Sequence, residues 1–180
     1  MAGIICAGFG GQGVLTMGLI LANCAMLAEN EVTWIPSYGS EMRGGTANCT
    51  IKISKEAIAS PYVKKIDVLI AMNEPSLKKF ENDVISGGTI IVNTSIIKAK
   101  VERSDVRVIN VEANDIAVKL NNSRAVNLIV LGTFAGATGL FTKDEMANGI
   151  ENYFSKKKID NSLNLKAYSE GFAIGEAQKG

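Results

Sequence analysis

The chain has 180 residues, of which 47% are hydrophobic and 21% charged, a composition typical of a folded globular protein rather than a disordered one. Nineteen basic residues against eighteen acidic ones leave a formal charge of +1, so nothing in the total charge favours nucleic acid or anionic lipid as a partner. The complete absence of histidine excludes Ser–His and Cys–His nucleophiles and histidine-ligated zinc within the chain.

The cysteines, Cys6, Cys24 and Cys49, are odd in number, far apart and set in apolar stretches. They form no C-x-x-C pair, so they predict neither an iron–sulfur cluster nor a disulfide framework. We expect all three to be buried reduced thiols, which favours a cytoplasmic location.

No charge precedes Glu29, and a long uncharged start could indicate a signal peptide or a membrane span. A signal peptide needs a basic beginning, which is missing, and glycines at positions 8, 10, 11 and 13 interrupt the apolar run that a span requires. We therefore expect a buried strand followed by a buried helix. We expect residues 1–180 to form one domain.

Apolar runs alternate with helical patterns along the chain, which indicates α/β layering. Strands are expected at 3–7, 32–35, 46–53, 67–72, 89–92 and 106–111. Helices are expected at 14–28, after Glu74-Pro75-Ser76, at 114–120 and 125–137, and from Thr142 and Asn161 onward. Asn73 is expected to cap the helix after it, and Thr142 with Glu145 has the form of a capping box.

The first candidate site is the glycine-rich turn between the first strand and the first helix. Residues 8–13 fit G-x-G-x-x-G, in which glycines allow close backbone approach and a helix N-terminus offers free N–H groups to an anion. A dinucleotide site would also need an acidic residue at the end of the second strand, where Pro36 and Ser37 stand instead. A phosphate-binding turn and a turn that only packs helix on strand remain alternatives.

The second candidate site is the segment Pro36–Gly45, expected to be a loop. It combines an aromatic ring (Tyr38), a carboxylate (Glu41) and an arginine before two glycines (Arg43). An arginine so placed can present its planar fork to a carboxylate, a phosphate or a partner's backbone. The alternative is a surface pair of Arg43 with Glu41. Asn127, set among apolar neighbours, is left open between a structural partner and a ligand contact.

Five segments in order resemble the gamma subunit of 2-oxoacid:ferredoxin oxidoreductases. They are GFGGQGV (8–14), PSYGSEMRGGTANC (36–49), DVLIAMNEPSL (67–77), GGTIIVN (87–93) and AVNLIVLG (125–132). The SYGSEMRGGTANC stretch is the specific part. The resemblance is closest to the 2-oxoglutarate type, with the branched-chain 2-oxoacid type next.

This resemblance implies a single three-layer, doubly wound, Rossmann-like α/β domain, with a mostly parallel sheet that admits an antiparallel strand. It implies a subunit, inactive alone, of an enzyme that decarboxylates a 2-oxoacid to its acyl-CoA and reduces ferredoxin. Thiamine diphosphate, Mg²⁺ and [4Fe–4S] clusters would be held by alpha and beta subunits, with or without a delta subunit, and no cofactor by this chain alone. The chain would complete the shared active site or the coenzyme A site.

The site residues carried over from the resemblance would face coenzyme A or the partner subunits, and neither a catalytic residue nor a metal ligand is expected among them. They are Gly10, Gly11, Gln12, Gly13, Ser37, Tyr38, Glu41, Arg43, Gly44 and Gly45. Alternatives are a free-standing nucleotide-binding protein and a purely structural assembly subunit. A homodimer is a further expectation for the isolated chain; nucleic acid and membrane are not expected partners.

Overall fold

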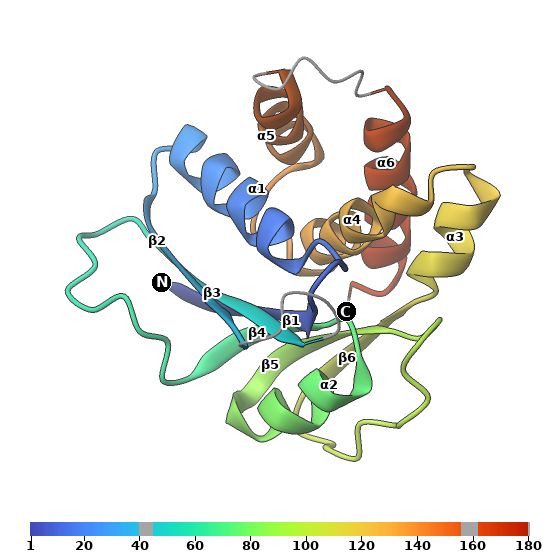
Figure 1. Ribbon diagram of the computed structural model, residues 1–180. Coiled ribbons are helices and arrows are strands. Elements are labelled where there is room, and N and C mark those ends of the chain that lie inside the picture. The colour runs from blue at the N-terminus through green and yellow to red at the C-terminus, as the bar shows by residue number, and fades with distance from the viewer. Residues whose placement is uncertain (40–44, 156–161, 180) are drawn as a thin grey trace.

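The computed structural model describes residues 1–39, 45–155 and 162–179 (Figure 1). The strands are β1 (Ala2–Phe9), β2 (Glu31–Tyr38), β3 (Thr46–Ser54), β4 (Ile66–Ala71), β5 (Val84–Asn93) and β6 (Arg107–Val111). The helices are α1 (Val14–Leu27), α2 (Glu74–Phe80), α3 (Ala113–Lys119), α4 (Val126–Thr138), α5 (Lys143–Ser155) and α6 (Ser162–Ala177). Two short 3₁₀ turns, Glu81–Asp83 and Ser123–Ala125, complete the described elements.

The strands form one sheet in the order β2-β3-β1-β4-β5-β6. The pairs β1–β4, β4–β5 and β5–β6 are parallel, whereas β3 runs antiparallel to both β1 and β2. The predicted fold class, a mostly parallel α/β sheet with an antiparallel strand, is therefore confirmed.

Strand β2 is longer than the predicted 32–35 and takes in part of the expected loop. Its pairing with β3 continues to Tyr38, opposite Ala47, although Pro36 lies within it. Proline cannot donate to a ladder, but β2 is an edge strand with a free side, where proline is tolerated. The true connection between β2 and β3 is therefore shorter than residues 36–45.

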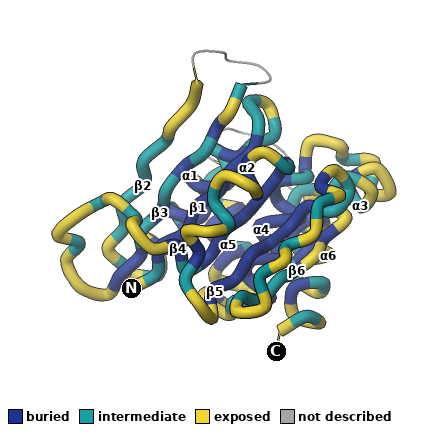
Figure 2. The backbone as a smooth tube through the Cα atoms, turned by 90° about the horizontal axis from the view of Figure 1, so that it is seen from below, coloured by how far each residue is buried: buried dark blue, intermediate teal, exposed yellow. Residues whose placement is uncertain are grey.

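Helices cover both faces of the sheet, unequally. Figure 1 shows α1, α4, α5 and α6 on one side and the short α2 on the other. The larger core cluster lies under α1 and α4 and includes the inward-facing residues of β3, among them Cys49 and Ile51. The central strands and α4 are the most continuously buried parts of the chain (Figure 2). This explains why helix 126–138 has no polar face in its sequence.

Helices α4 and α6 cross at close range because glycines lie on both sides of the contact. A Cβ on Gly132 would lie 2.7 Å from the backbone nitrogen of Phe172, and one on Gly171 would lie 2.7 Å from the carbonyl carbon of Ile129. Gly136 and Gly175 repeat the arrangement one turn further along. Glycine at these positions therefore sets the distance between the two helix axes.

Local signals at helix ends are confirmed. The Thr142 hydroxyl accepts from the Glu145 backbone N–H at 3.2 Å, and the Glu145 carboxylate accepts from the Thr142 N–H at 2.8 Å, forming the predicted capping box. Cys6, Cys24 and Cys49 are free and buried, as expected. Burial raises the pKa of Cys24 to about 12, so this thiol stays protonated at neutral pH.

We expect Asn73→Ala to lower the free energy of unfolding by about 1 kcal/mol, because Asn73 caps helix α2. Its Oδ1 accepts from the Ser76 backbone N–H at 2.9 Å. The Asn73 Nδ2, by contrast, is buried without a hydrogen-bond partner among the described residues. Asn73→Ser, which keeps a capping oxygen and removes that amide, should unfold closer to wild type in urea titration. Equal losses in both variants would contradict the capping role.

Candidate functional site

The glycine-rich turn leaves the carboxyl end of β1 and enters α1. Gly11 and Gly13 have φ angles of 97° and 73°, in the left-handed region that glycine tolerates best. The Gly10 N–H donates to the Gly45 carbonyl at 2.9 Å, which joins the turn to the start of β3. A Cβ on Gly11 would meet no atom within 4 Å, so the turn has an open side at this residue.

Gln12 holds the turn against the neighbouring strand. Its side-chain Oε1 accepts from the Phe9 backbone N–H at 2.7 Å, and its Nε2 donates to the Met72 carbonyl at 3.1 Å. The side chain thus bridges the carboxyl ends of β1 and β4, two adjacent parallel strands. Both ends of the amide are used within the chain, which makes Gln12 a positioning residue of the turn.

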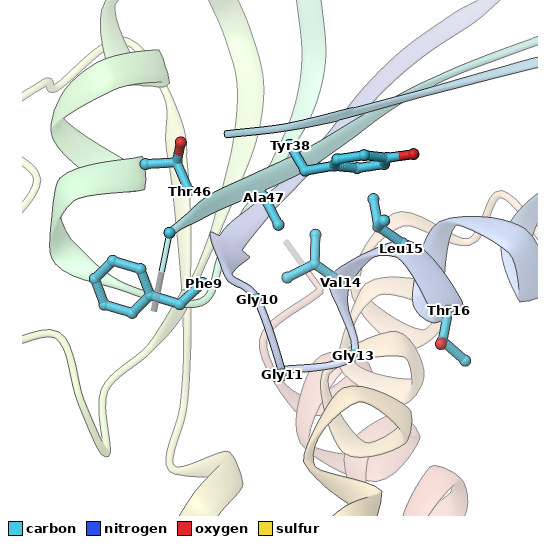
Figure 3. Close-up of a pocket in the computed structure, with 11 residues that line it drawn as sticks. Phe9, Gly10, Gly11, Gly13, Val14, Leu15, Thr16, Tyr38, Thr46 and Ala47 are labelled. Atoms are coloured by element: carbon cyan, nitrogen blue, oxygen red, sulfur yellow. The ribbon is translucent and has the colours of Figure 1, made fainter. Parts of the chain in front are cut away.

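The main cavity lies between the turn, the start of α1 and the ends of β2 and β3, with a volume of about 510 Å³. Its lining residues are Phe9, Gly10, Gly11, Gly13, Val14, Leu15, Thr16, Tyr38, Gly45, Thr46 and Ala47. In Figure 3 the side chains of Val14, Leu15, Ala47 and Tyr38 converge above the turn. The wall is therefore mostly apolar, with backbone groups of the glycines at one end.

A second, more polar cavity of about 280 Å³ opens on the other side of the turn. Asn114, Ser123 and Arg124 line it opposite Gly11 and Gln12. These three residues were not predicted as part of the site, because they lie in a different segment from the glycine motif. The signal that could have found them is the cluster of short polar residues after the strand at 107–111, at the edge where parallel strands end.

The structure brings most of the predicted site residues together around the turn. Gly10, Gly11, Gly13, Tyr38 and Gly45 line the main cavity, and Gln12 lines the second one. Ser37 is exposed on the edge strand opposite Asn48 and lines neither cavity. Glu41, Arg43 and Gly44 lie outside the described residues.

The sequence left open whether the Asn127 side chain has a structural partner or contacts a ligand, and the structure shows a structural partner at this site. Its side-chain nitrogen donates to the Gly13 carbonyl at 3.4 Å, and the residue is 8% exposed. A Cβ on Gly13 would lie 2.8 Å from that nitrogen. Asn127 therefore packs helix α4 against the glycine turn.

The described residues of the two cavities present mainly apolar side chains, short polar side chains and backbone groups. Histidine is absent from the chain, and the described lining residues of the two cavities include one charged side chain, Arg124. Across the described part of the chain, no three His, Cys, Asp or Glu side chains gather in a way that could hold a metal ion. An apolar pocket beside free backbone N–H groups suits a ligand or a partner segment with an anionic end.

The sheet order and the glycine turn at the end of its central strand β1 define a Rossmann-like α/β domain, in which the turn lines both cavities. Residues 3–174 match the pyruvate ferredoxin/flavodoxin oxidoreductase family, and the chain belongs to that family. The resemblance seen in the sequence is thereby confirmed.

Relatives in this family are subunits of 2-oxoacid oxidoreductases. The chain is 41% identical over 167 residues to the ketoisovalerate oxidoreductase subunit VorA of Methanothermobacter thermautotrophicus, covering 92% of this chain and 34% of that one. It is 31% identical over 173 residues to the 2-oxoglutarate synthase subunit KorC of Methanocaldococcus jannaschii, covering 94% of this chain and 91% of KorC. The chain thus spans about a third of VorA and nearly all of KorC.

Two solved structures share the fold. The gamma subunit of a keto/oxoacid ferredoxin oxidoreductase from Geobacter sulfurreducens has a TM-score of 0.80 at 23% identity, over 98% of this chain and 99% of that one. A 2-oxoglutarate:ferredoxin oxidoreductase from Magnetococcus marinus has a TM-score of 0.85 at 23% identity, over 98% of this chain and 31% of that one. Among the described residues, no helix combines the length and the hydropathy that crossing a bilayer requires.

Proposed function

We propose that this chain is the gamma subunit of a 2-oxoacid:ferredoxin oxidoreductase that converts a 2-oxoacid to its acyl-CoA and passes the electrons to ferredoxin. The observation that carries the proposal is the family match over residues 3–174, joined to a KorC relative of nearly the same length. The chain acts as one domain, in a reducing cytoplasm that suits its three free buried cysteines. It is inactive alone.

We place the reactive cofactors on partner subunits. The three cysteines are buried and no metal-ligating group of three occurs in the described residues, so this part of the chain fits neither a [4Fe–4S] cluster nor an Mg²⁺–thiamine diphosphate site. Alpha and beta subunits, and in some assemblies a delta subunit, would supply those groups. This chain contributes the glycine turn, the two cavities and the segment around Arg43.

We assign 2-oxoglutarate as the substrate, because the match to KorC covers nearly the whole of that subunit. A branched-chain 2-oxoacid is the second candidate, favoured by the 41% identity to a ketoisovalerate oxidoreductase subunit. Affinity purification of the tagged chain from its native cell, followed by CoA-dependent dye reduction with 2-oxoglutarate, ketoisovalerate and pyruvate, tests both. Recovery of the chain without thiamine-binding and iron–sulfur partners would overturn the proposal.

The glycine turn and the main cavity would hold part of coenzyme A. Backbone N–H groups at the turn can donate hydrogen bonds to a phosphate, and the apolar wall of Val14, Leu15 and Tyr38 suits the uncharged arm of that molecule. Coenzyme A is bound in the Magnetococcus marinus enzyme, which shares this fold. Contact with a partner subunit is the alternative use of the same surface.

We expect Arg43→Ala in the assembled enzyme to raise the KM for coenzyme A about tenfold, since it removes one charge-assisted contact to a phosphate. Arg43→Lys keeps the charge but loses the planar fork, so its KM for coenzyme A should lie between those of the wild type and the Arg43→Ala variant. The measurement is steady-state dye reduction at varied coenzyme A. Lower turnover at an unchanged KM would assign Arg43 to the subunit interface instead.

A further inference from the structure

Two of the three cysteines lie side by side on neighbouring strands of the sheet. Cys6 of β1 and Cys49 of β3 are directly opposite in the antiparallel register, and both are 0% exposed. Opposite residues in such a pair point to the same face and have Cα atoms about 4.5 or 5.5 Å apart. Both values lie inside the range of about 4.4–6.8 Å that a disulfide spans.

The surroundings of the pair make its two sulfurs chemically unequal. The Cys49 Sγ lies 3.6 Å from the Val14 carbonyl and packs over Gly18 beside the ring nitrogen of Trp34. A hydrogen bond from Cys6 lowers the pKa of Cys49, as does the nearby Trp34 N–H, and raises the pKa of Cys6. Cys49 is thus the sulfur better able to carry a negative charge.

The Trp34 N–H is itself unusual, since it is buried and makes no hydrogen bond of ordinary geometry within the described residues. The Trp34 ring also lines a shallow surface groove between α1, β2 and α5, together with Leu19 and Met26. Trp34 therefore separates the sulfur pair from this groove. A small solute that displaces the ring would reach Cys49 first.

We propose that Cys6 and Cys49 form a reversible disulfide that responds to a peroxide. The Cys49 thiolate attacks one oxygen of the peroxide; an S–O bond forms, the O–O bond breaks, and the leaving oxygen departs as water with the proton that Cys49 released. The Cys6 sulfur then attacks Cys49 Sγ; the S–S bond forms, the S–O bond breaks, and a second water leaves with the Cys6 proton. The two sulfurs together lose two electrons, which the peroxide gains.

The disulfide would act on the main cavity through β1, β3 and α1. Strand β1 carries the glycine turn and β3 begins beside Gly45, so the bond ties two walls of the cavity together. The oxidised Cys49 also loses the hydrogen with which its thiol approaches the Val14 carbonyl at the start of α1. Cys24, packed against Gly149 and facing the Met146 carbonyl, lies in a different contact and stays reduced.

The test uses the full purified chain, reduced and then exposed to hydrogen peroxide. The chain contains one tryptophan, Trp34, so tryptophan emission reports on the surroundings of this one ring, which include the Cys49 sulfur. We expect the emission to fall, the thiol titre of the denatured chain to drop from three to one, and peptide mapping to show Cys6 linked to Cys49. Dithiothreitol should restore all three readings.

The Cys24→Ala variant is the matched control, because the only disulfide it can form within one chain is Cys6–Cys49. It should show the same loss of emission, with the titre falling from two thiols to none. Cys49→Ala should abolish the fluorescence change if it folds. A linkage involving Cys24, overoxidation without a cross-link, or an unchanged titre in the folded Cys24→Ala chain would each overturn the proposal.

Discussion

Replacing Gly171 by alanine should lower the free energy of unfolding by about 3 kcal/mol, the upper part of the range for overpacking a core. The added methyl would fall 2.7 Å from the carbonyl carbon of Ile129 and 2.9 Å from its Cα. These are backbone atoms of helix α4, which cannot rotate away as a side-chain end can. Helices α4 and α6 must therefore move apart in the variant. Urea unfolding of the variant and the wild type measures the difference in the free energy of unfolding.

The sign of the effect distinguishes close packing from helix propensity. Alanine is a better helix former than glycine by about 1 kcal/mol, so propensity alone would make Gly171→Ala stabilising. Ala173, exposed on the same helix, is the matched control, and Ala173→Gly should cost about that amount. A Gly171→Ala chain as stable as wild type would mean that the two helices are not held at this distance.

Replacing Gln12 by alanine should lower the free energy of unfolding by about 2 kcal/mol, since it removes two partly buried hydrogen bonds of about 1 kcal/mol each. It should also reduce turnover of the assembled enzyme, because the turn would lose its tie to Met72 at the end of β4. Chemical unfolding of the chain and dye reduction by the complex measure the two effects separately.

A second glutamine in the chain provides the control. Gln178 likewise uses both ends of its side-chain amide, accepting from the Asn110 N–H at 3.1 Å and donating to the Asn110 carbonyl at 2.9 Å. Because Gln178 lies outside both cavities, Gln178→Ala should affect stability and leave turnover unchanged. Equal turnover in the Gln12→Ala complex and wild type would indicate that the turn serves packing alone, which is the structural-subunit alternative.

The two cavities share the glycine turn as a common wall. Gly11 and Gly13 line both, and Asn127 braces the turn from helix α4. The Gln12 amide joins the ends of β1 and β4 and lines the second cavity. The missing acidic residue after β2 argues against a nucleotide held as in a dinucleotide-binding enzyme.

Most helices and strands could be predicted from the local pattern of residues. Alternation in residues 46–53 and the continuous apolar run after Asp67 predicted β3 and β4, since strand faces follow a period of two and buried parallel strands are apolar on both faces. The capping roles of Asn73 and Thr142 also followed from sequence, because a cap acts within three residues. The predicted end of β2 at residue 35 was wrong. Proline usually stops a strand, and Pro36 is allowed here only because β2 is an edge strand.

Residue types and their short-range spacing were enough to predict the class of fold, the glycine turn and the burial of the cysteines, because each depends on local pattern. The folded chain was needed to show that Gln12 bonds the Met72 carbonyl, that Asn127 bonds the Gly13 carbonyl, and that Arg124 lines a cavity with the turn. The position of Cys6 opposite Cys49 likewise follows from the strand pairing. These contacts join segments far apart in the chain, and the strand order that brings them together is fixed by how the whole sheet buries its two faces.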